Sequence, residues 1–319
     1  MPAQRILVTG GAGFIGSHLT EALVAAGYGV RVVDNLSTGH IANLASVADQ
    51  IEFVEGDLAD FATAQSAVAG CHAVFHEAAI PSVPRSIREP LQSHASGPTA
   101  TLNLLEAARA AGVTRFIFAA SSSAYGDTEE LPKHENMLPC PLSPYAASKL
   151  AGEQYVRVYA QTMGLDGVSL RYFNVYGPRQ DPSSPYSGVV SIFAEHLQAD
   201  RAPTIYGDGT QTRDFTYIAD VVQANLLALR AKGPLGGQVL NVGGGRRISL
   251  LELLETMNQV LGKKLTARHQ PARAGDVRDS LASLDRIGRV LGYAPKVSLE
   301  SGLTETLEWA ARHTGQART

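Results

Sequence analysis

Tyr145 and Lys149 lie four residues apart at the start of a predicted helix over residues 145–163, directly after Ser143 and Pro144. Residues four apart share one face of a helix, so the phenol and the ammonium would lie close together. A free phenol is a poor base at neutral pH, but nearby positive charge stabilises its phenolate form. Lowering its pKa by about three units needs roughly 4 kcal/mol, which an ammonium and a second nearby positive charge can supply together. The pair therefore predicts a phenolate base that removes a proton from an alcohol.

Three consecutive serines, Ser121, Ser122 and Ser123, follow a predicted strand over residues 115–119. Open α/β sheets bind ligands at the carboxyl ends of their strands, so a serine there can hold the hydroxyl group on which the phenol acts. Each feature alone has an ordinary explanation: a surface pair for the tyrosine and the lysine, and a turn for the serines. Their coincidence with a glycine-rich turn near the amino terminus favours the chemical interpretation.

That turn runs from Thr9 to Gly16 and joins a predicted strand to a predicted helix. In such turns Gly10 permits a tight bend, Gly13 lets the backbone approach a pyrophosphate, and Gly16 lets the helix pack closely on the strand. The amino terminus of the helix then offers N–H donors to the anion. Asp34 ends the second predicted strand, where a carboxylate binds a ribose 2′-hydroxyl and repels a 2′-phosphate. The turn predicts a site for NAD rather than NADP, and a loop cap is the alternative role for Asp34.

Short apolar runs alternate with Ala-, Leu- and Glu-rich stretches through the first half of the chain, a pattern typical of a parallel sheet covered on both faces. The predicted strands there are Arg5–Val8, Gly29–Val33, Ile51–Val54, Ala73–Phe75, Arg115–Ala119 and Gly167–Arg171, and the predicted helices are His18–Ala26, Phe61–Val68, Thr101–Ala111 and Tyr145–Met163. After Gly177 we expect helices at Val189–Ala199, Asp220–Ala231, Ser249–Leu261 and Leu299–His313, and a strand at Val239–Val242. The fold class is α/β. We expect a Rossmann-type doubly wound parallel sheet over residues 1–176, with returning segments near 214–245, and a smaller α/β carboxy-terminal substrate domain mainly over 177–319.

The composition excludes several classes of protein. Hydrophobic residues make up 45% and charged residues 18% of the 319, so disorder is not expected. A net charge of −3 without a Lys/Arg run argues against a nucleic-acid partner, and no apolar run is long enough to span a membrane. The two cysteines, Cys71 and Cys140, form no disulfide framework and suggest the cytoplasm, and the scattered histidines predict no metal site.

The glycine turn, the serine run and the Tyr145–Lys149 pair together resemble the extended short-chain dehydrogenase/reductase family. Segments 34–39 and 56–58 match the adenosine side of its cofactor site, and segments 170–177, 206–215 and 273–276 resemble the nucleotide-sugar branch. Within that branch the sequence is most similar to the UDP-hexose 4-epimerases, especially those acting on N-acetylhexosamines, as residues 82–86 and 179–182 indicate.

The resemblance implies a reaction in which NAD stays tightly bound and is regenerated. Tyr145 would take the C4-hydroxyl proton while C4 gives hydride to NAD⁺, and the 4-ketose would rotate and take the hydride back on its other face. Lys149 would tune the phenol and contact the nicotinamide ribose. Ser121 would contact a substrate hydroxyl, with Ser123 assisting.

The resemblance also implies the binding residues. Around NAD it places Gly10, Gly13, Phe14, Ile15, Gly16, Asp34, Asn35, Ser37, Thr38, Gly39, Asp57, Leu58, Ala78, Ala79, Tyr145, Lys149 and Tyr172. Around the UDP-sugar it places Ser82, Ser121, Ser123, Tyr145, Asn174, Val189, Tyr206, Arg213, Arg273, Asp276 and Ser280. Asn174, Arg213 and Arg273 would hold the diphosphate, and Asp276 the uridine ribose. For each arginine alone, a surface salt bridge is the alternative.

Ser280 bears on the choice of sugar. In the resembling enzymes a tyrosine at this position limits the space around the sugar C2, so serine favours UDP-GlcNAc and UDP-GalNAc, with UDP-glucose and UDP-galactose tolerated. The alternative is that Ser280 only packs a loop. The sequence is also compatible with an epimerase restricted to non-acetylated sugars, a nucleotide-sugar decarboxylase and a non-catalytic NAD sensor. Ser122 and Ser123 stand where related dehydratases carry an Asp-Glu pair.

Two positions depart from the family pattern. Gly97 replaces a usual asparagine, and with Pro98 it predicts a break or restart of the helix. Glu77 replaces a usual neutral residue; it would either oppose phenolate formation or face solvent. The resemblance further implies a homodimer that pairs the helices near 101–111 and 145–163 across a two-fold axis.

Overall fold

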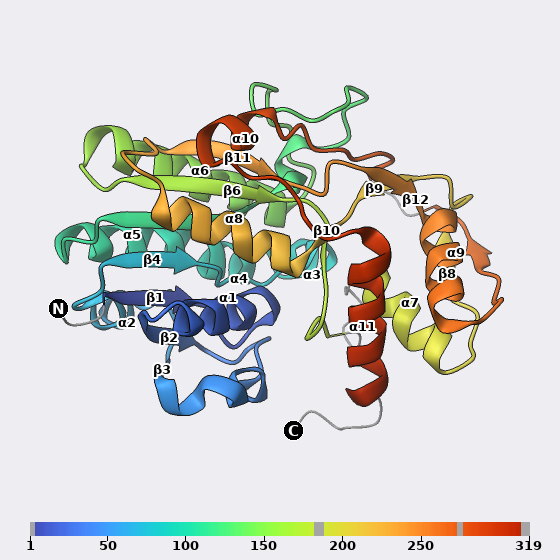
Figure 1. Ribbon diagram of the computed structural model, residues 1–319. Helices are drawn as coiled ribbons and strands as arrows, with labels where there is room; N and C mark the ends of the chain where they lie inside the picture. Colours follow the sequence, from blue (N-terminus) through green and yellow to red (C-terminus); the bar gives the residue numbers. More distant parts are fainter. Residues whose placement is uncertain (1–3, 182–187, 273–276, 314–319) are drawn as a thin grey trace.

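The computed structural model describes residues 4–181, 188–272 and 277–313. Its central feature is a seven-stranded sheet in the order β11-β6-β5-β4-β1-β2-β3 (Figure 1). All its neighbouring strands are parallel. The strands are β1 (Arg5–Thr9), β2 (Gly29–Asp34), β3 (Ile51–Glu55), β4 (Ala73–His76), β5 (Arg115–Ser121), β6 (Gly167–Tyr172) and β11 (Gln238–Val242). The predicted fold class and the predicted strands are confirmed, and the observed strands extend the predictions by one or two residues, as β5 does to Ser121.

Helices cover both faces of this sheet. On one face lie α1 (Phe14–Ala25) and α8 (Ile218–Arg230), and on the other lie α2 (Phe61–Val68), α5 (Ala100–Ala110) and α6 (Pro144–Thr162). The sheet accordingly separates two hydrophobic clusters. Ile6 and Val8 of β1 belong to the first and Leu7 to the second, because successive side chains of a strand point to opposite faces. Helix α1 begins at Phe14, earlier than the predicted His18.

The remaining elements form a smaller region beside the sheet (Figure 1). It contains α7 (Val189–Gln198), α9 (Leu250–Leu261), α11 (Leu299–His313) and the short strand pairs β7–β10, β9–β12 and β8–β13. Helix α10 (Asp285–Leu291) instead returns to the large sheet, where it packs against β11 and α8. The short strands are β7 (Val175–Tyr176), β8 (Thr204–Tyr206), β9 (Thr212–Asp214), β10 (Thr216–Tyr217), β12 (Arg247–Ser249) and β13 (Arg268–Gln270). Ser249 caps α9 through a capping box with Glu252.

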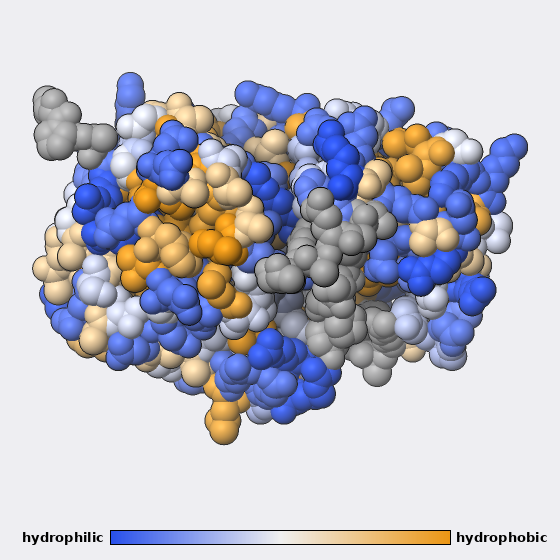
Figure 2. Space-filling view, turned by 90° about the horizontal axis from the view of Figure 1, so that it is seen from below, coloured by the Kyte–Doolittle hydropathy of each residue, from blue (hydrophilic) through white to orange (hydrophobic). Residues whose placement is uncertain are grey.

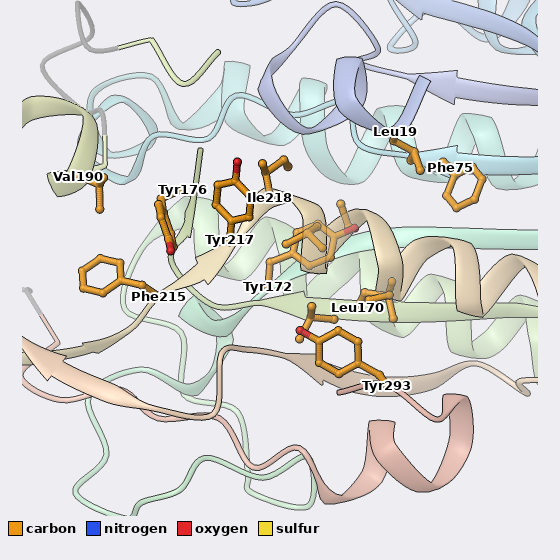
Figure 3. Packing of buried hydrophobic residues seen from close by; sticks show 14 of the residues in the cluster. Leu19, Phe75, Leu170, Tyr172, Tyr176, Val190, Phe215, Tyr217, Ile218 and Tyr293 are labelled. Carbon is orange, nitrogen blue, oxygen red and sulfur yellow. The ribbon is translucent and has the colours of Figure 1, made fainter. Parts of the chain in front are cut away.

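One continuous core joins the two regions. Tyr176 and Tyr217 pack at 5.4 Å between ring centroids, and Phe215 meets Tyr176 edge-on at 6.2 Å. Figure 3 shows these rings between Leu170 on the sheet and Val190 on α7. The smaller region is therefore packed against the sheet by aromatic side chains rather than only tethered to it.

The helix that was expected to break at Gly97-Pro98 continues instead. A π-helical turn, η2 (Ala95–Thr99), joins α4 (Pro90–His94) to α5. Pro98 has no N–H to donate, and its ring would clash with a carbonyl in a regular α-helix, so the wider turn accommodates it. A Cβ on Gly97 would lie 3.1 Å from the Cβ of Ser148, so glycine lets this turn approach α6 closely.

Further short elements were not expected from the sequence: η1 (Ile41–Gln50), α3 (Val83–Arg88) and η3 (Ser122–Tyr125). Seen from below, hydrophobic residues gather on the half of the surface that carries the large sheet, interspersed with hydrophilic ones (Figure 2). Within the three described stretches, no helix combines the length and the apolar composition needed to cross a bilayer.

Candidate active site

A cavity of about 1360 Å³ lies along the carboxyl edge of the large sheet. Residues at the ends of four of its strands line it: Asp34 of β2, Glu77 after β4, Ser121 of β5 and Tyr172 of β6. The smaller region closes the cavity from the side with residues such as Ser280. This edge is where open α/β sheets bind ligands.

The glycine-rich turn forms one end of the cavity. Gly10 has a φ of 66° and lies so close to the following loop that a Cβ would be 2.7 Å from the Cα of Ala78. A Cβ on Gly16 would be 2.2 Å from the carbonyl oxygen of Gly10, so this residue also has to be glycine. Around Gly13, by contrast, only that carbonyl oxygen lies near, at 3.1 Å, and no side chain caps the helix there. The turn thus leaves space and the amino terminus of α1 for an anion.

Asp34 braces the same turn from β2. Its Oδ2 accepts a hydrogen bond from the N–H of Ala12 at 3.0 Å, and its Oδ1 accepts one from the N–H of Leu36 at 2.9 Å. Burial raises the pKa of this carboxyl, while these two bonds lower it in part. The carboxylate therefore shapes the loop and also lines the cavity where a ribose would lie.

Tyr145, Lys149 and the serines converge near the middle of the cavity. Ser143 caps α6 by accepting from the N–H of Ala146, so Tyr145 lies in the first turn. The Lys149 Nζ donates to the carbonyl of Ala119 on β5 at 2.7 Å. The Ser123 hydroxyl donates to that of Ser121 at 2.8 Å, and the Ser121 hydroxyl in turn meets the Tyr145 phenol. The structure thus brings together Tyr145, Lys149 and the serines, as the sequence predicted.

Burial shapes the ionisation of the central pair. It raises the pKa of Tyr145, although the bond with Ser121 lowers it in part. It lowers the pKa of Lys149 to about 8, although Glu77 and Glu153 raise it. The chain alone therefore holds Tyr145 as a neutral phenol and Lys149 as an ammonium at neutral pH. The second positive charge invoked from the sequence, that of an oxidised nicotinamide, is needed to make the phenol a base.

The polar residues of the smaller region are linked to one another. The Asn174 Nδ2 donates to the carbonyl of Asp214 at 2.9 Å and to the Ser280 hydroxyl at 3.2 Å. Nη1 of Arg213 donates to the carbonyls of Thr212 and Arg278, each at 2.9 Å. A diphosphate contact by the Asn174 side-chain amide would require it to give up one of these bonds.

Every residue of the predicted NAD set lines the cavity, as do Ser82, Asn174, Arg213 and Ser280 of the predicted substrate set. Two predicted residues do not line it: Val189 begins α7, and Tyr206 ends β8. Arg273 and Asp276 lie outside the described residues.

Further lining residues were not predicted from the sequence. Lys133 is 1% exposed and donates to the Thr128 hydroxyl at 2.5 Å, and nothing in its local sequence signals burial. Arg179 has a φ of 69° and donates to the Glu21 carboxylate at 2.6 Å. Its place in the segment 179–182 was the available signal.

Comparisons with known proteins agree with this geometry. Residues 6–243 match the NAD dependent epimerase/dehydratase family. The UDP-glucose 4-epimerase of Mycolicibacterium smegmatis is 42% identical, with 96% of this chain and 98% of the relative covered. The UDP-N-acetylglucosamine 4-epimerase of Methanobrevibacter ruminantium, solved with UDP-N-acetylmuramic acid, is 35% identical, covers 98% of this chain and all of its own, and has a TM-score of 0.93. The UDP-glucose 4-epimerase of Thermus thermophilus, solved with NAD, is 39% identical, with the same coverage and a TM-score of 0.88.

The open space at Gly13 makes a direct test of the dinucleotide site. We expect Gly13→Ala to weaken NADH binding by about tenfold or more, because the methyl group occupies space that the pyrophosphate needs. Its φ of −77° suits alanine, so the fold should persist. The measurement is a fluorescence titration with NADH, with Gly29→Ala as control because its nearest atoms would lie 3.9 Å from the added carbon. Equal affinity in Gly13→Ala and the wild type would contradict the assignment.

Proposed function

This chain belongs to the NAD dependent epimerase/dehydratase family, and from that membership we propose how its site works and which sugars it accepts. The protein is an NAD-dependent UDP-sugar 4-epimerase, and hence an isomerase. The proposed range is UDP-GlcNAc and UDP-GalNAc, with UDP-glucose and UDP-galactose also accepted. The observation that carries this range is the small Ser280 side chain in the cavity wall.

The residues around the cavity fit NAD, because Gly13 leaves space at an uncapped helix terminus and Asp34 ends β2 at the ribose position. When bound, NAD supplies the reversible hydride acceptor. Tyr145 would remove the C4-hydroxyl proton, and Lys149 would stabilise the resulting phenolate with its ammonium. Ser121, already bonded to Ser123, would hold the sugar hydroxyl in reach of the phenol.

Tyr145→Phe tests the base directly. We expect turnover to fall by about a hundredfold to ten-thousandfold, the usual cost of losing a general base, because Ser123, the other described side chain that contacts Ser121, is a weaker base than the phenolate. NADH affinity should stay within about twofold, because the ring is kept. The measurement is a coupled epimerase assay beside NADH titration, with Tyr28→Phe, outside the cavity, as the matched control. A variant with wild-type rates would remove Tyr145 from the mechanism.

The diphosphate is proposed to lie against Arg213, whose guanidinium lines the cavity and suits bidentate contact with phosphate oxygens. Asn174 and Ser280 are bonded to each other beside it, so the pocket for the sugar and the diphosphate site share a wall. Arg273 and Asp276 remain proposals from the resemblance.

Ser280 is proposed to admit the N-acetyl group. Its side chain is 9% exposed, lines the cavity and accepts hydrogen bonds from Asn174 and, at 3.4 Å, from the N–H of Asp214. These bonds also give it a role in packing, which is the competing explanation. A bulky replacement at this position would take up space in the cavity wall, because Ser280 lines the cavity.

We expect Ser280→Tyr to lower kcat/KM for UDP-GlcNAc and UDP-GalNAc by about a hundredfold and for UDP-glucose by less than about fivefold, because added bulk acts on the larger sugar. Each of the four UDP-sugars would be incubated with the enzyme, and products identified by NMR. Ser283→Tyr, nearby in the chain but outside the cavity, is the control. Equal loss on all four sugars would assign Ser280 to packing only, and no acetylated product from the wild type would end the proposed range.

We also propose the division into an NAD-binding region over residues 1–176, with returning segments near 214–245, and a substrate region over 177–319.

A homodimer through α5 and α6 is proposed as well, because α6 and the residue after it expose Tyr155, Val158 and Met163 at 36%, 48% and 40%. Sedimentation velocity should give twice the chain mass of 33.8 kDa, and Val158→Lys should shift it toward the monomer. A wild-type monomer at micromolar concentration would refute the dimer.

A further inference from the structure

Glu77 lies at the centre of the sheet edge. It directly follows β4, whose His76 is paired with Phe118 of β5, so Glu77 comes level with Ala119. The carbonyl of Ala119 is the group that holds the Lys149 Nζ. The backbone of Glu77 and the ammonium of Lys149 therefore lie at the same level of the sheet edge, and the charge of each acts on the pKa of the other. Of the two alternatives for Glu77, a carboxylate that faces solvent does not agree with the structure, because its Oε2 is buried.

A chain of two hydrogen bonds fixes the position of this carboxylate. The Tyr172 hydroxyl donates to Oε1 of Glu77 at 2.9 Å, and the Asn225 amide donates to the Tyr172 oxygen at 2.8 Å. Because side chains of β4 alternate, His76 points to the opposite face, where Thr101 of α5 contacts it. Oε2 of Glu77 is buried and has no hydrogen-bond partner among the described residues. A carboxyl group left in this way stays ionised only when a nearby positive charge balances it, and otherwise takes up a proton.

The other ionisable groups around the pair are neutral or matched elsewhere, although Glu153 also raises the pKa of Lys149. Glu153 is paired with Arg171 by two bonds of 2.8 and 2.7 Å, so its charge is already matched. His76 is held neutral, because burial and Lys149 lower its pKa to about 3. Tyr145 and Tyr172 are neutral phenols, since burial raises the pKa of both. Lys149 and Glu77 are thus left as each other's counter-charge.

We propose that Glu77 is a positioning residue of the epimerisation: its fixed, buried carboxylate keeps Lys149 in the ammonium form that the phenol needs. This inference rests on the proposed function in that Lys149 is taken as the ammonium of the reaction. The carboxylate does not contact the reacting atoms. It acts by holding a proton on Nζ in surroundings whose burial favours the neutral amine.

The pH window follows from the two groups. Burial raises the pKa of Glu77 to about 7, although the bond with Tyr172 and the charge of Lys149 lower it. Burial lowers the pKa of Lys149 to about 8. Because each charge favours the other, both groups are charged together over an intermediate range of pH between the protonation of Glu77 and the deprotonation of Lys149. Below the window Glu77 gains a proton, and above it Lys149 loses one, so the alkaline limb of activity reports Lys149.

The test is Glu77→Gln, which keeps an oxygen to accept from Tyr172 and removes only the charge. We expect the alkaline limb of kcat/KM to move down by about one pH unit. At pH 8 the rate then falls about fivefold, while near pH 6.5 it stays within about twofold of the wild type. Glu305→Gln is the matched control, because Glu305 also accepts from a tyrosine, Tyr217 at 2.6 Å, but lies on α11. Glu77→Asp, which keeps the charge, should restore most of the wild-type limb.

A second readout does not depend on turnover. The affinity of the apoprotein for NADH is measured from about pH 6 to 10. It should fall as the pH rises through the pKa of Lys149, and in Glu77→Gln the midpoint of this fall should lie about one pH unit lower. Lys149→Met should remove the transition. If Glu77→Gln does not fold, Glu77→Met serves instead, because it has similar length and no charge.

The outcomes separate the two claims. In one outcome, Glu77→Gln differs from the wild type and Glu305→Gln neither in the alkaline limb of kcat/KM nor in the midpoint of the NADH titration. That result would show that Glu77 only holds Tyr172, and it would overturn the inference. A shift in Glu77→Asp as large as in Glu77→Gln would overturn it as well. A wild-type chain that epimerises none of the UDP-sugars would refute the proposed function, while the NADH titration would still decide the role of Glu77.

Discussion

The whole site depends on one geometric constraint: the carboxyl ends of parallel strands all lie at the same edge of the sheet. Thr9, Asp34, His76, Ser121 and Tyr172 end five neighbouring strands, and the loops that follow them all open on the same cavity. Residues distant in the chain therefore meet because the strands that carry them are neighbours in the sheet. The pairing of β4 with β5 even sets which of them face each other, since it brings Glu77 level with the carbonyl that holds Lys149.

The same edge explains how the protein tolerates several buried charges. Lys149 lines the cavity, and Lys149, Glu153 and Arg171 are all buried, where desolvation would neutralise an isolated ion. Arg171 and Glu153 satisfy each other through a two-bond contact, and the Arg171 guanidinium stacks at 4.5 Å on the Tyr125 ring. The arrangement leaves one ammonium and one carboxylate free to respond to a ligand, which is what a site for reversible proton transfer requires.

Much of this arrangement could be predicted from the sequence where a local pattern has one physical cause. The strands of the large sheet were found because buried parallel strands are continuously apolar. The turn at Gly10 and Gly16 could be assigned because added carbons there would collide with backbone. Tyr145 and Lys149 could be paired because helical spacing alone puts them on one face.

The rest depended on contacts between distant segments. Pro98 was expected to break a helix, but packing of the neighbouring turn against Ser148 favours a widened one, and no local pattern shows that neighbour. The burial of Glu77 comes from Tyr172 and Asn225, which lie on another strand and another helix. Lys133 is buried because its segment bridges to Ala282. In each case the sequence names the residue but not its surroundings.

The edge strand β11 has a consequence for how this chain is made. Strand β6 pairs with β5 on one side and with β11 on the other, and β11 is translated much later than β6, after α7 and α8. Until then a nascent chain carries an apolar strand with an open row of backbone donors and acceptors, the kind of surface on which strands of other chains add. A fragment cut at residue 176 would keep that open row permanently, so the dinucleotide half should aggregate when expressed without the segment that returns to it.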